Sequence, residues 1–241
     1  MKKVDLNVDI GEGFPFDEAL LEFATSANVC CGVYAGSPEL TRATIDLCRS
    51  KGVRVGIHPG YPNREAMGRE TTSLAEAIAS LPAQLAPFGF GEAMYVKPHG
   101  ALYNLSSFAS ERSERVSEGS SRRPKIEPEA ARLVEAIFEI PVTPRALMGL
   151  PGTGHELLAR RNEVEFIREG FADRAYTASG RLVPRGEPGA ILQDPAQIRA
   201  QVLNLAPRVD SICLHGDTPG CLEFAELLRR TLVDAGYEVG W

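Results

Sequence analysis

The stretch Val4-Asp5-Leu6-Asn7-Val8-Asp9-Ile10 decides the fold of this chain. Its apolar and polar residues alternate strictly, which predicts a β-strand with all three polar side chains on one face. A buried parallel strand is normally apolar on both faces, so this polar face must line a polar interior, a ligand site or solvent. Solvent would suit a strand at the edge of a sheet, and a polar interior would suit a closed barrel.

Further apolar runs rich in Val and Ile recur along the chain between helix-like segments. Together with the first strand they predict seven strands, at residues 4–10, 27–31, 53–58, 93–97, 145–150, 164–169 and 211–215. Amphipathic segments such as 38–50 and 221–235 predict covering helices. Repeated strand–helix units indicate a parallel α/β sheet, either closed into a barrel or open and doubly wound.

The ends of the predicted strands favour the barrel. In a barrel the carboxyl ends of all strands converge on one mouth, where the active sites of such enzymes lie. Polar or ionisable residues stand at or just after most of these ends: Asn28, His58, Lys97, His99, His215 and Asp217. The fourth histidine, His155, stands instead at a predicted helix start, where we expect a solvated or capping role. We therefore predict a single barrel domain over residues 1–241.

Composition excludes several classes of partner. The chain has 241 residues, of which 44% are apolar, and a formal net charge of -6, so no basic field favours nucleic acid or an anionic membrane. No run approaches the roughly 20 apolar residues of a membrane span, and no signal peptide is evident, which favours the cytoplasm. The five cysteines show no CxxC spacing and indicate reduced structural thiols. We expect small molecules or proteins as partners.

One segment, residues 106–129, breaks the regular pattern. It is rich in Ser, Glu and Arg and cannot bury a core, so we expect a mobile surface loop there.

The residues at the predicted mouth allow two kinds of chemistry. Histidines and carboxylates could bind a divalent metal, or they could act as general acid and base without one. Lys97 falls on the same face as His99 and could hold an anionic group. Near the predicted sixth strand, Arg174 and Arg185 either bind a carboxylate or phosphate or form an Arg–Asp salt bridge that pins a long loop. No GxxxxGK[ST] or GxGxxG phosphate loop occurs, so ATP would have to be bound without one.

Several blocks of the chain resemble a known family. The blocks are Asp5-Leu6-Asn7-Val8-Asp9-Ile10-Gly11-Glu12-Gly13, Ser26-Ala27-Asn28-Val29-Cys30-Cys31-Gly32, His58-Pro59, Val96-Lys97-Pro98-His99-Gly100, Phe171-Ala172-Asp173-Arg174-Ala175-Tyr176 and Cys213-Leu214-His215-Gly216-Asp217. In this order they resemble the LamB/YcsF family, whose members are the A subunits of prokaryotic 5-oxoprolinase. The resemblance implies an irregular seven-stranded (β/α) barrel related to the glycoside hydrolase/deacetylase superfamily. It also implies ATP-dependent opening of 5-oxoproline to L-glutamate, in a complex with B and C subunits.

The implied reaction assigns roles to the mouth residues. ATP, with Mg as its counter-ion, would phosphorylate the lactam oxygen, and the B and C subunits would share in that step. For catalysis we expect one of Asp5, Asp9 and Glu12 to activate water, and one of His58, His99 and His215 to protonate the departing nitrogen. For binding of substrate or phosphate we expect Asn7, Asn28, Lys97, Asp173, Arg174, Arg185 and Asp217.

The chain departs from the family pattern after its second predicted strand. Where the family usually reads Gly-Phe-His-Ala-Gly-Asp, this chain has Gly32-Val33-Tyr34-Ala35-Gly36-Ser37. Because a histidine and a carboxylate are lost, we expect no tightly bound transition metal. Two other functions remain open: a metal-dependent carbohydrate deacetylase or amidohydrolase, and a catalytically silent scaffold subunit of the same complex.

Overall fold

The computed structural model describes residues 2–110 and 125–241. Within these residues seven parallel strands close into a barrel, because the last of them pairs with the first. In order around the barrel they are β1 (Lys3–Ile10), β2 (Ser26–Cys30), β3 (Arg54–His58), β4 (Tyr95–Val96), β7 (Ala146–Gly149), β8 (Glu165–Phe171) and β9 (Ser211–His215). The predicted seven-stranded (β/α) barrel is confirmed.

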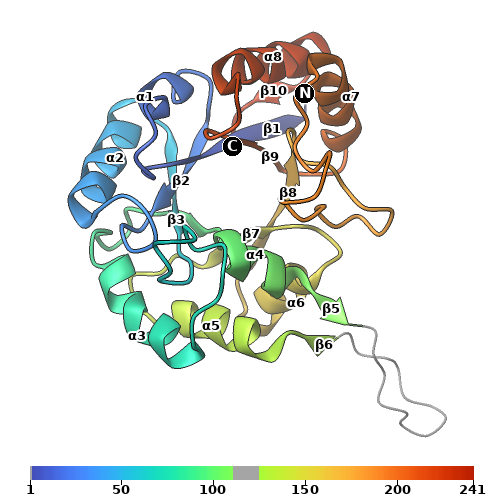
Figure 1. Cartoon of the computed structure of the whole chain (residues 1–241). Helices are drawn as coiled ribbons and strands as arrows, with labels where there is room; N and C mark the ends of the chain where they lie inside the picture. The colour runs from blue at the N-terminus through green and yellow to red at the C-terminus, as the bar shows by residue number, and fades with distance from the viewer. Residues whose placement is uncertain (1, 111–124) are drawn as a thin grey trace, which may run out of the picture.

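Helices surround the barrel and cover the outer face of its strands (Figure 1). In chain order they are α1 (Asp17–Leu20), α2 (Pro38–Ser50), α3 (Leu74–Leu85), α4 (Gly100–Ser107), α5 (Pro128–Phe138), α6 (Gly154–Arg161), α7 (Pro195–Leu205) and α8 (Cys221–Asp234). Local sequence sets where they begin: Ser37 Oγ accepts the Leu40 N–H at the start of α2, and Ser73 and Glu76 form a capping box at the start of α3.

Strand β1 has the alternation that its sequence predicts. Its apolar side chains are buried in the core between the sheet and the helices, where each contributes about 1.5–3 kcal/mol. These residues are Val4, Leu6, Val8 and Ile10. The polar side chains between them, Asp5, Asn7 and Asp9, form hydrogen bonds with polar groups of other strands across the barrel interior. The interior of the barrel is therefore polar along β1.

Three short strands were not predicted. Strand β10 (Glu238–Val239) pairs in parallel with the beginning of β1. Strands β5 (Ala109–Ser110) and β6 (Lys125–Ile126) pair in antiparallel within the segment expected to be a mobile loop. Helices α4 and α5 also extend into that segment, and residues 111–124 lie outside the described residues.

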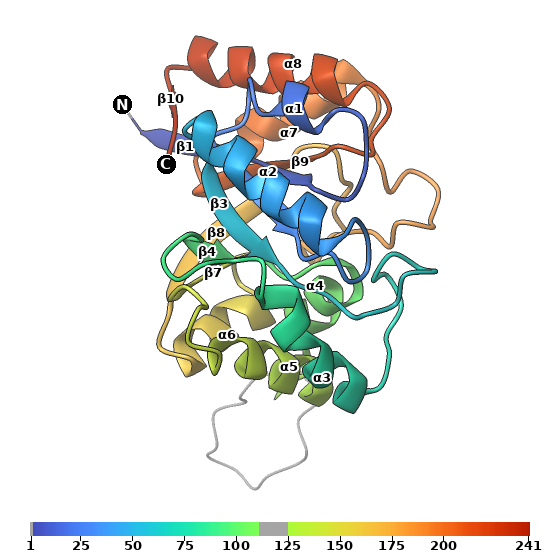
Figure 2. The ribbon, with the colours of Figure 1, turned by 90° about the vertical axis from the view of Figure 1, so that its left-hand side faces the viewer.

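The two ends of the barrel differ. The strands run toward the right-hand side of Figure 2, where the longest described loops gather, and both chain termini lie at the opposite end. Among the residues described, no helix has the length and apolar character needed to cross a membrane. The end with the long loops is the C-terminal mouth.

Candidate functional site

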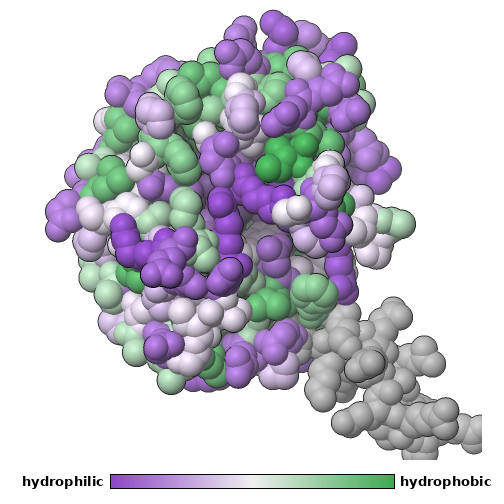
Figure 3. All heavy atoms as spheres, in the orientation of Figure 1, coloured by the Kyte–Doolittle hydropathy of each residue, from purple (hydrophilic) through white to green (hydrophobic). Residues whose placement is uncertain are grey.

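A cavity of about 520 Å³ opens at the C-terminal mouth of the barrel. This volume falls in the range of about 300–1,000 Å³ that is common for small-molecule sites. Hydrophilic side chains gather around the hollow at the centre of this face (Figure 3). Most predicted site residues line the cavity: Asp9, Glu12, His58, Lys97, His99, Arg174, Arg185, His215 and Asp217. The structure thus brings together side chains from β1, β3 and β9 and from the loops after β1, β4, β8 and β9.

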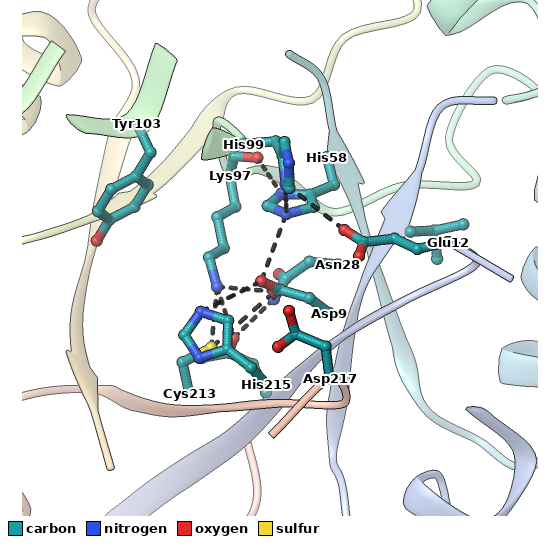
Figure 4. Close-up of polar contacts among 12 residues, drawn as sticks. Asp9, Glu12, Asn28, His58, Lys97, His99, Tyr103, Cys213, His215 and Asp217 are labelled. Carbon is teal, nitrogen blue, oxygen red and sulfur yellow. Dashed lines mark hydrogen bonds and ion pairs between the residues drawn. The ribbon is translucent and has the colours of Figure 1, made fainter. Parts of the chain in front are cut away.

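Lys97 lies at the centre of this group, and its ammonium points toward Asp9 (Figure 4). The ammonium nitrogen lies 2.9 Å from Asp9 Oδ1 and 2.8 Å from Glu169 Oε1. Burial alone would lower the pKa of Lys97, but the Asp9 and Glu169 carboxylates hold it well above its ordinary value. Lys97 is therefore a fixed cation between Asp9, which is half-buried, and Glu169, which is fully buried. Its charge is paired within the protein, although we expected it to bind an anionic substrate group.

Asp9 is held as a carboxylate. Its Oδ1 also accepts a hydrogen bond from Asn28 Nδ2 at 2.7 Å. Its Oδ2 lies 3.5 Å from His58 Nε2 and 3.8 Å from His215 Nε2. Burial alone would raise the pKa of Asp9, but the Lys97 ammonium holds it well below its ordinary value. One oxygen of Asp9 is thus fixed by donors, and the other faces two imidazole rings.

His215 forms a pair with Asp173. Nδ1 of His215 lies 2.9 Å from Asp173 Oδ1, and Thr218 Oγ1 donates to Asp173 Oδ2 at 2.6 Å. The Phe171 ring stacks against the imidazole, with 5.5 Å between ring centroids. Burial alone would lower the pKa of His215, but the Asp173 carboxylate raises it above its ordinary value. Such an imidazolium is a suitable general acid.

The other two mouth histidines face each other. His58 Nδ1 lies 2.7 Å from the Lys97 carbonyl oxygen, and His99 Nε2 lies 2.8 Å from the Met67 carbonyl oxygen. Their remaining nitrogens, His58 Nε2 and His99 Nδ1, are 3.0 Å apart. Tyr34 contacts both residues: its hydroxyl donates to the His58 backbone carbonyl oxygen at 2.8 Å, and its ring stacks on the His99 imidazole at 4.1 Å.

Glu12 stands beside these histidines. Its Oε1 lies 3.6 Å from His99 Nδ1, and burial together with the Asp9 charge raises the pKa of Glu12 to about 7. Two groups of described residues have ligand atoms within 4.8 Å of one another, close enough for one metal ion: Glu12, His58 and His99, and Asp9, Cys213 and His215.

Arginine side chains border the cavity. Asp217 accepts from Arg69 Nη2 at 2.9 Å and from Arg185 Nη2 at 2.5 Å, which ties the loops after β3 and β8 to the loop after β9. Arg174 instead donates to two backbone carbonyls of its own loop, at 3.3 and 2.7 Å. Within the described residues Arg174 forms no ion pair, whereas Arg185 pairs with Asp217, so the Arg–Asp salt bridge that we left open as an alternative is found at Arg185 and not at Arg174.

Asp5 does not lie at the mouth, which corrects our expectation. It stands four residues before Asp9 on β1, or about 13 Å along an extended strand. Its Oδ1 accepts from Thr25 Oγ1 at 2.6 Å and Ser26 Oγ at 2.7 Å, and its Oδ2 pairs with Arg54 at 3.2 Å. Asp5 therefore belongs to a closed polar layer at the other end of the barrel.

Asn7 and Asn28 lie between these two layers. Asn28 Nδ2 donates to both Asn7 Oδ1 and Asp9 Oδ1, each at 2.7 Å, and the Tyr95 hydroxyl donates to Asn28 Oδ1 at 2.7 Å. Neither asparagine lines the cavity. They position Asp9 from the interior of the barrel, although we expected the two asparagines to contact the substrate.

Sequence reasoning missed Glu169. It is fully buried, and its Oε2 accepts a hydrogen bond from the Tyr103 hydroxyl at 2.8 Å. The sequence of β8 carried a signal for this burial. Glu169 lies two residues from both Ile167 and Phe171, which are buried, so it shares their face of the strand, whereas Arg168 is exposed. Glu169 supplies the second carboxylate that holds Lys97.

His155 is at a helix start, as predicted, but it is buried rather than solvated. Its Nδ1 accepts the Leu150 N–H at 3.1 Å, and its Nε2 lies 2.9 Å from both the Tyr103 carbonyl oxygen and Ser106 Oγ. Thr153 provides the cap instead. His155 is therefore a buried structural residue that packs against α4.

The fold and the cavity define a (β/α) barrel protein with a carboxylate–histidine site at its C-terminal mouth. The LamB/YcsF family model matches residues 4–240, and the chain belongs to that family. Over 262 residues it is 38% identical to the A subunit of 5-oxoprolinase from Neisseria meningitidis serogroup C (strain 053442), with 99% of each chain covered.

Two further relatives extend this comparison. The chain is 36% identical over 254 residues to the A subunit of 5-oxoprolinase from Haemophilus influenzae (strain PittEE), with 96% of each chain covered. The crystal structure of a lactam utilization protein from Thermus thermophilus matches with a TM-score of 0.79 and 29% identity, covering 100% of this chain and 99% of that one.

Proposed function

We propose that this chain is the A subunit of an ATP-dependent 5-oxoprolinase, a hydrolase that opens the lactam ring of 5-oxoproline to give L-glutamate. The names of relatives that match nearly the whole chain support this assignment. The observation that carries the chemistry is the His215–Asp173 pair, whose free nitrogen faces the Asp9 carboxylate across the cavity at 3.8 Å. A proton donor, His215, and an anion, Asp9, thus lie at the same small-molecule site.

The lactam must be activated before it opens, because an unactivated amide is stable in neutral water. In our proposal ATP, with Mg as its counter-ion, phosphorylates the lactam oxygen, and the B and C subunits share in that step. The absence of a GxxxxGK[ST] or GxGxxG loop from the sequence supports a need for partners. The cavity described above would receive the activated ring.

Asp9 and His215 would carry out the ring opening. Once the lactam carbon is activated, water needs to be oriented more than deprotonated, and an ionised carboxylate such as Asp9 suits that task. His215, whose pKa Asp173 raises despite burial, would donate a proton from Nε2 to the departing nitrogen. Water addition would leave a hydroxyl on the activated carbon, and as the C–N bond breaks this hydroxyl would lose its proton to solvent and become the carbonyl of γ-glutamyl phosphate. A second water would then hydrolyse this acyl phosphate to L-glutamate and inorganic phosphate. Lys97 would keep Asp9 ionised throughout.

Arg174 is the best candidate for binding the substrate carboxylate. Its guanidinium borders the cavity and bonds only to backbone carbonyls, so its charge is not neutralised by direct contact with a described carboxylate. A planar guanidinium matches a carboxylate in geometry. The charge of Arg185 is instead neutralised by its ion pair with Asp217.

We propose that the complex works in the cytoplasm, which would supply ATP. The five cysteines support a reducing compartment, because all are buried free thiols.

The direct test is 5-oxoproline-dependent ATP hydrolysis, measured with this chain alone and with its B and C partners. We expect little or no activity from the chain alone and coupled formation of ADP and glutamate by the assembled complex. ATP-coupled ring opening by the isolated chain would contradict the division of labour. No activity from the complex, with its subunits associated, would favour a scaffold role instead.

A further inference from the structure

At the mouth of the barrel, a lone pair on a ring nitrogen of His58 faces a lone pair on a ring nitrogen of His99. A carbonyl oxygen can only accept a hydrogen bond, so His58 Nδ1 and His99 Nε2 must carry the protons donated to Lys97 and Met67. A neutral imidazole has one N–H, which leaves His58 Nε2 and His99 Nδ1 without hydrogen. These two nitrogens lie 3.0 Å apart, a repulsive arrangement unless a cation lies against both.

The arrangement is built into the fold. The Tyr34 hydroxyl holds the backbone carbonyl of His58, and the Tyr34 ring stacks on the His99 imidazole. The Met67 carbonyl oxygen that orients His99 comes from a residue with φ of 48°, followed by Gly68 with φ of 66°. A Cβ on Gly68 would lie 3.0 Å from His99 Cδ2 and 3.2 Å from Tyr34 Cγ, so the backbone approaches these rings closely. Imidazoles that bind metal typically donate their other N–H to a carbonyl or carboxylate in this way.

A carboxylate completes the set. Glu12 Oε1 lies 3.6 Å from His99 Nδ1, and the ligand atoms of Glu12, His58 and His99 all lie within 4.8 Å of one another (Figure 4). Ligand atoms bound to one ion at about 2.0–2.2 Å are spaced about 3–4 Å apart. Two imidazoles and one carboxylate, with a further position open, form a known ligand set of catalytic zinc.

We propose that Glu12, His58 and His99 bind one zinc ion at the mouth of the barrel. An extra proton shared by the two rings would also remove their repulsion, but it would lie between the two nitrogens and leave Glu12 Oε1, 3.6 Å from His99 Nδ1, beyond hydrogen-bond distance. A metal ion engages all three groups. Asp9 Oδ2, 3.5 Å from His58 Nε2, stands where it can accept a hydrogen bond from water on the open side.

This inference replaces our expectation that no transition metal binds tightly. That expectation rested on Tyr34 and Ser37, which stand where the family usually has His and Asp. Ser37 caps helix α2, and Tyr34 stacks on His99 and bonds the backbone of His58, so neither departure removes a member of the three-residue set. When bound, zinc would polarise a carbonyl or lower the pKa of a bound water to about 7.

Calorimetric titration of chelator-treated protein with zinc chloride tests the site without any substrate. We expect one zinc ion per chain, and a Kd raised by at least about 100-fold in Glu12→Gln and in His99→Gln, more than loss of an outer contact causes. Two matched controls should keep the wild-type Kd. His155→Gln changes the histidine away from the mouth, and Cys213→Ser changes the neighbouring Asp9–Cys213–His215 group.

The imidazole nitrogens of the wild-type protein provide a second readout that does not depend on the folding of a variant. Zinc should shift the ¹⁵N resonances of His58 Nε2 and His99 Nδ1 and leave those of His155 unchanged. A spectrum that shows one proton shared by His58 and His99, with no response to zinc, would overturn the proposal. So would undiminished zinc binding in Glu12→Gln and His99→Gln. Because neither measurement uses 5-oxoproline, failure of the metal site and failure of the proposed function are distinguishable.

Discussion

Nδ1 of His215 lies 2.9 Å from Asp173 Oδ1, and this contact holds the opposite ring nitrogen 3.8 Å from Asp9 Oδ2. The two carboxylates have different tasks in our account. Asp173, fully buried and bonded to Thr218, raises the pKa of the imidazole despite burial. Asp9, on the cavity side, would orient the attacking water.

Asp173→Asn should lower turnover of the assembled complex by about 10²–10⁴-fold, because it weakens the general acid. Asp173 raises the pKa of His215, so its loss lowers that pKa and deprotonates the imidazole at a lower pH. The alkaline limb of the pH–rate profile should therefore move to lower pH. Thr218→Val keeps the carboxylate and should therefore leave the alkaline limb close to that of the wild-type complex. An unchanged profile in Asp173→Asn would assign the acid to another residue.

Lys97→Met should lower the free energy of unfolding by about 3–5 kcal/mol, because it leaves Asp9 and Glu169 buried without their cation. Urea unfolding measures the effect. The double variant Lys97→Met/Glu169→Gln should be less destabilised than the sum of its single variants, since Glu169→Gln removes one uncompensated charge. Strict additivity would mean that the two residues are not coupled.

The barrel was predictable from the sequence because its signal is local. Strand β1 alternates over seven residues, and the other strands are apolar runs long enough to stand out. Strand β10 was missed because two residues carry no periodicity, and its pairing depends on the distant beginning of β1.

The site was only partly predictable because residues that share a strand face do not all lie at the same depth in the barrel. Asp5 and Asp9 share a face of β1, yet one lies in a closed layer and the other at the cavity. Glu169 was missed because its partner, Lys97, lies 72 positions away in the chain. Its role follows only from closure of the sheet.

His155 should make the protein sensitive to acid. Burial lowers the pKa of His155 from 6.5 to about 3, so the unfolded chain takes up the proton first as pH falls. Its contribution is fully present above pH 6.5 and is lost as pH falls toward 3, at up to about 1.4 kcal/mol per pH unit. His155→Gln should show a shallower loss of unfolding free energy between about pH 6 and 5. Ser106→Ala keeps the imidazole and should keep the slope, so equal slopes in all three proteins would exclude His155 as the cause.

Arg174→Ala should raise the KM for 5-oxoproline in the assembled complex much more than it lowers the melting temperature, because a buried guanidinium at the cavity would bind the substrate carboxylate. Arg168→Ala is a matched control: Arg168 pairs with Asp210, outside the cavity, and its loss should leave KM unchanged. A large drop in melting temperature with an unchanged KM would mean that Arg174 only holds its loop.

The most direct measurement is glutamate formation from 5-oxoproline and ATP by complexes assembled with the wild-type chain, with His215→Ala or with Asp9→Asn. Both variants should retain association with the B and C subunits, because a barrel mouth can lose a catalytic group without losing its packed core. Our account predicts that each assembled variant forms essentially no glutamate, whereas the wild-type complex does. Wild-type rates of glutamate formation in both variants would contradict the claim that this mouth opens the lactam ring.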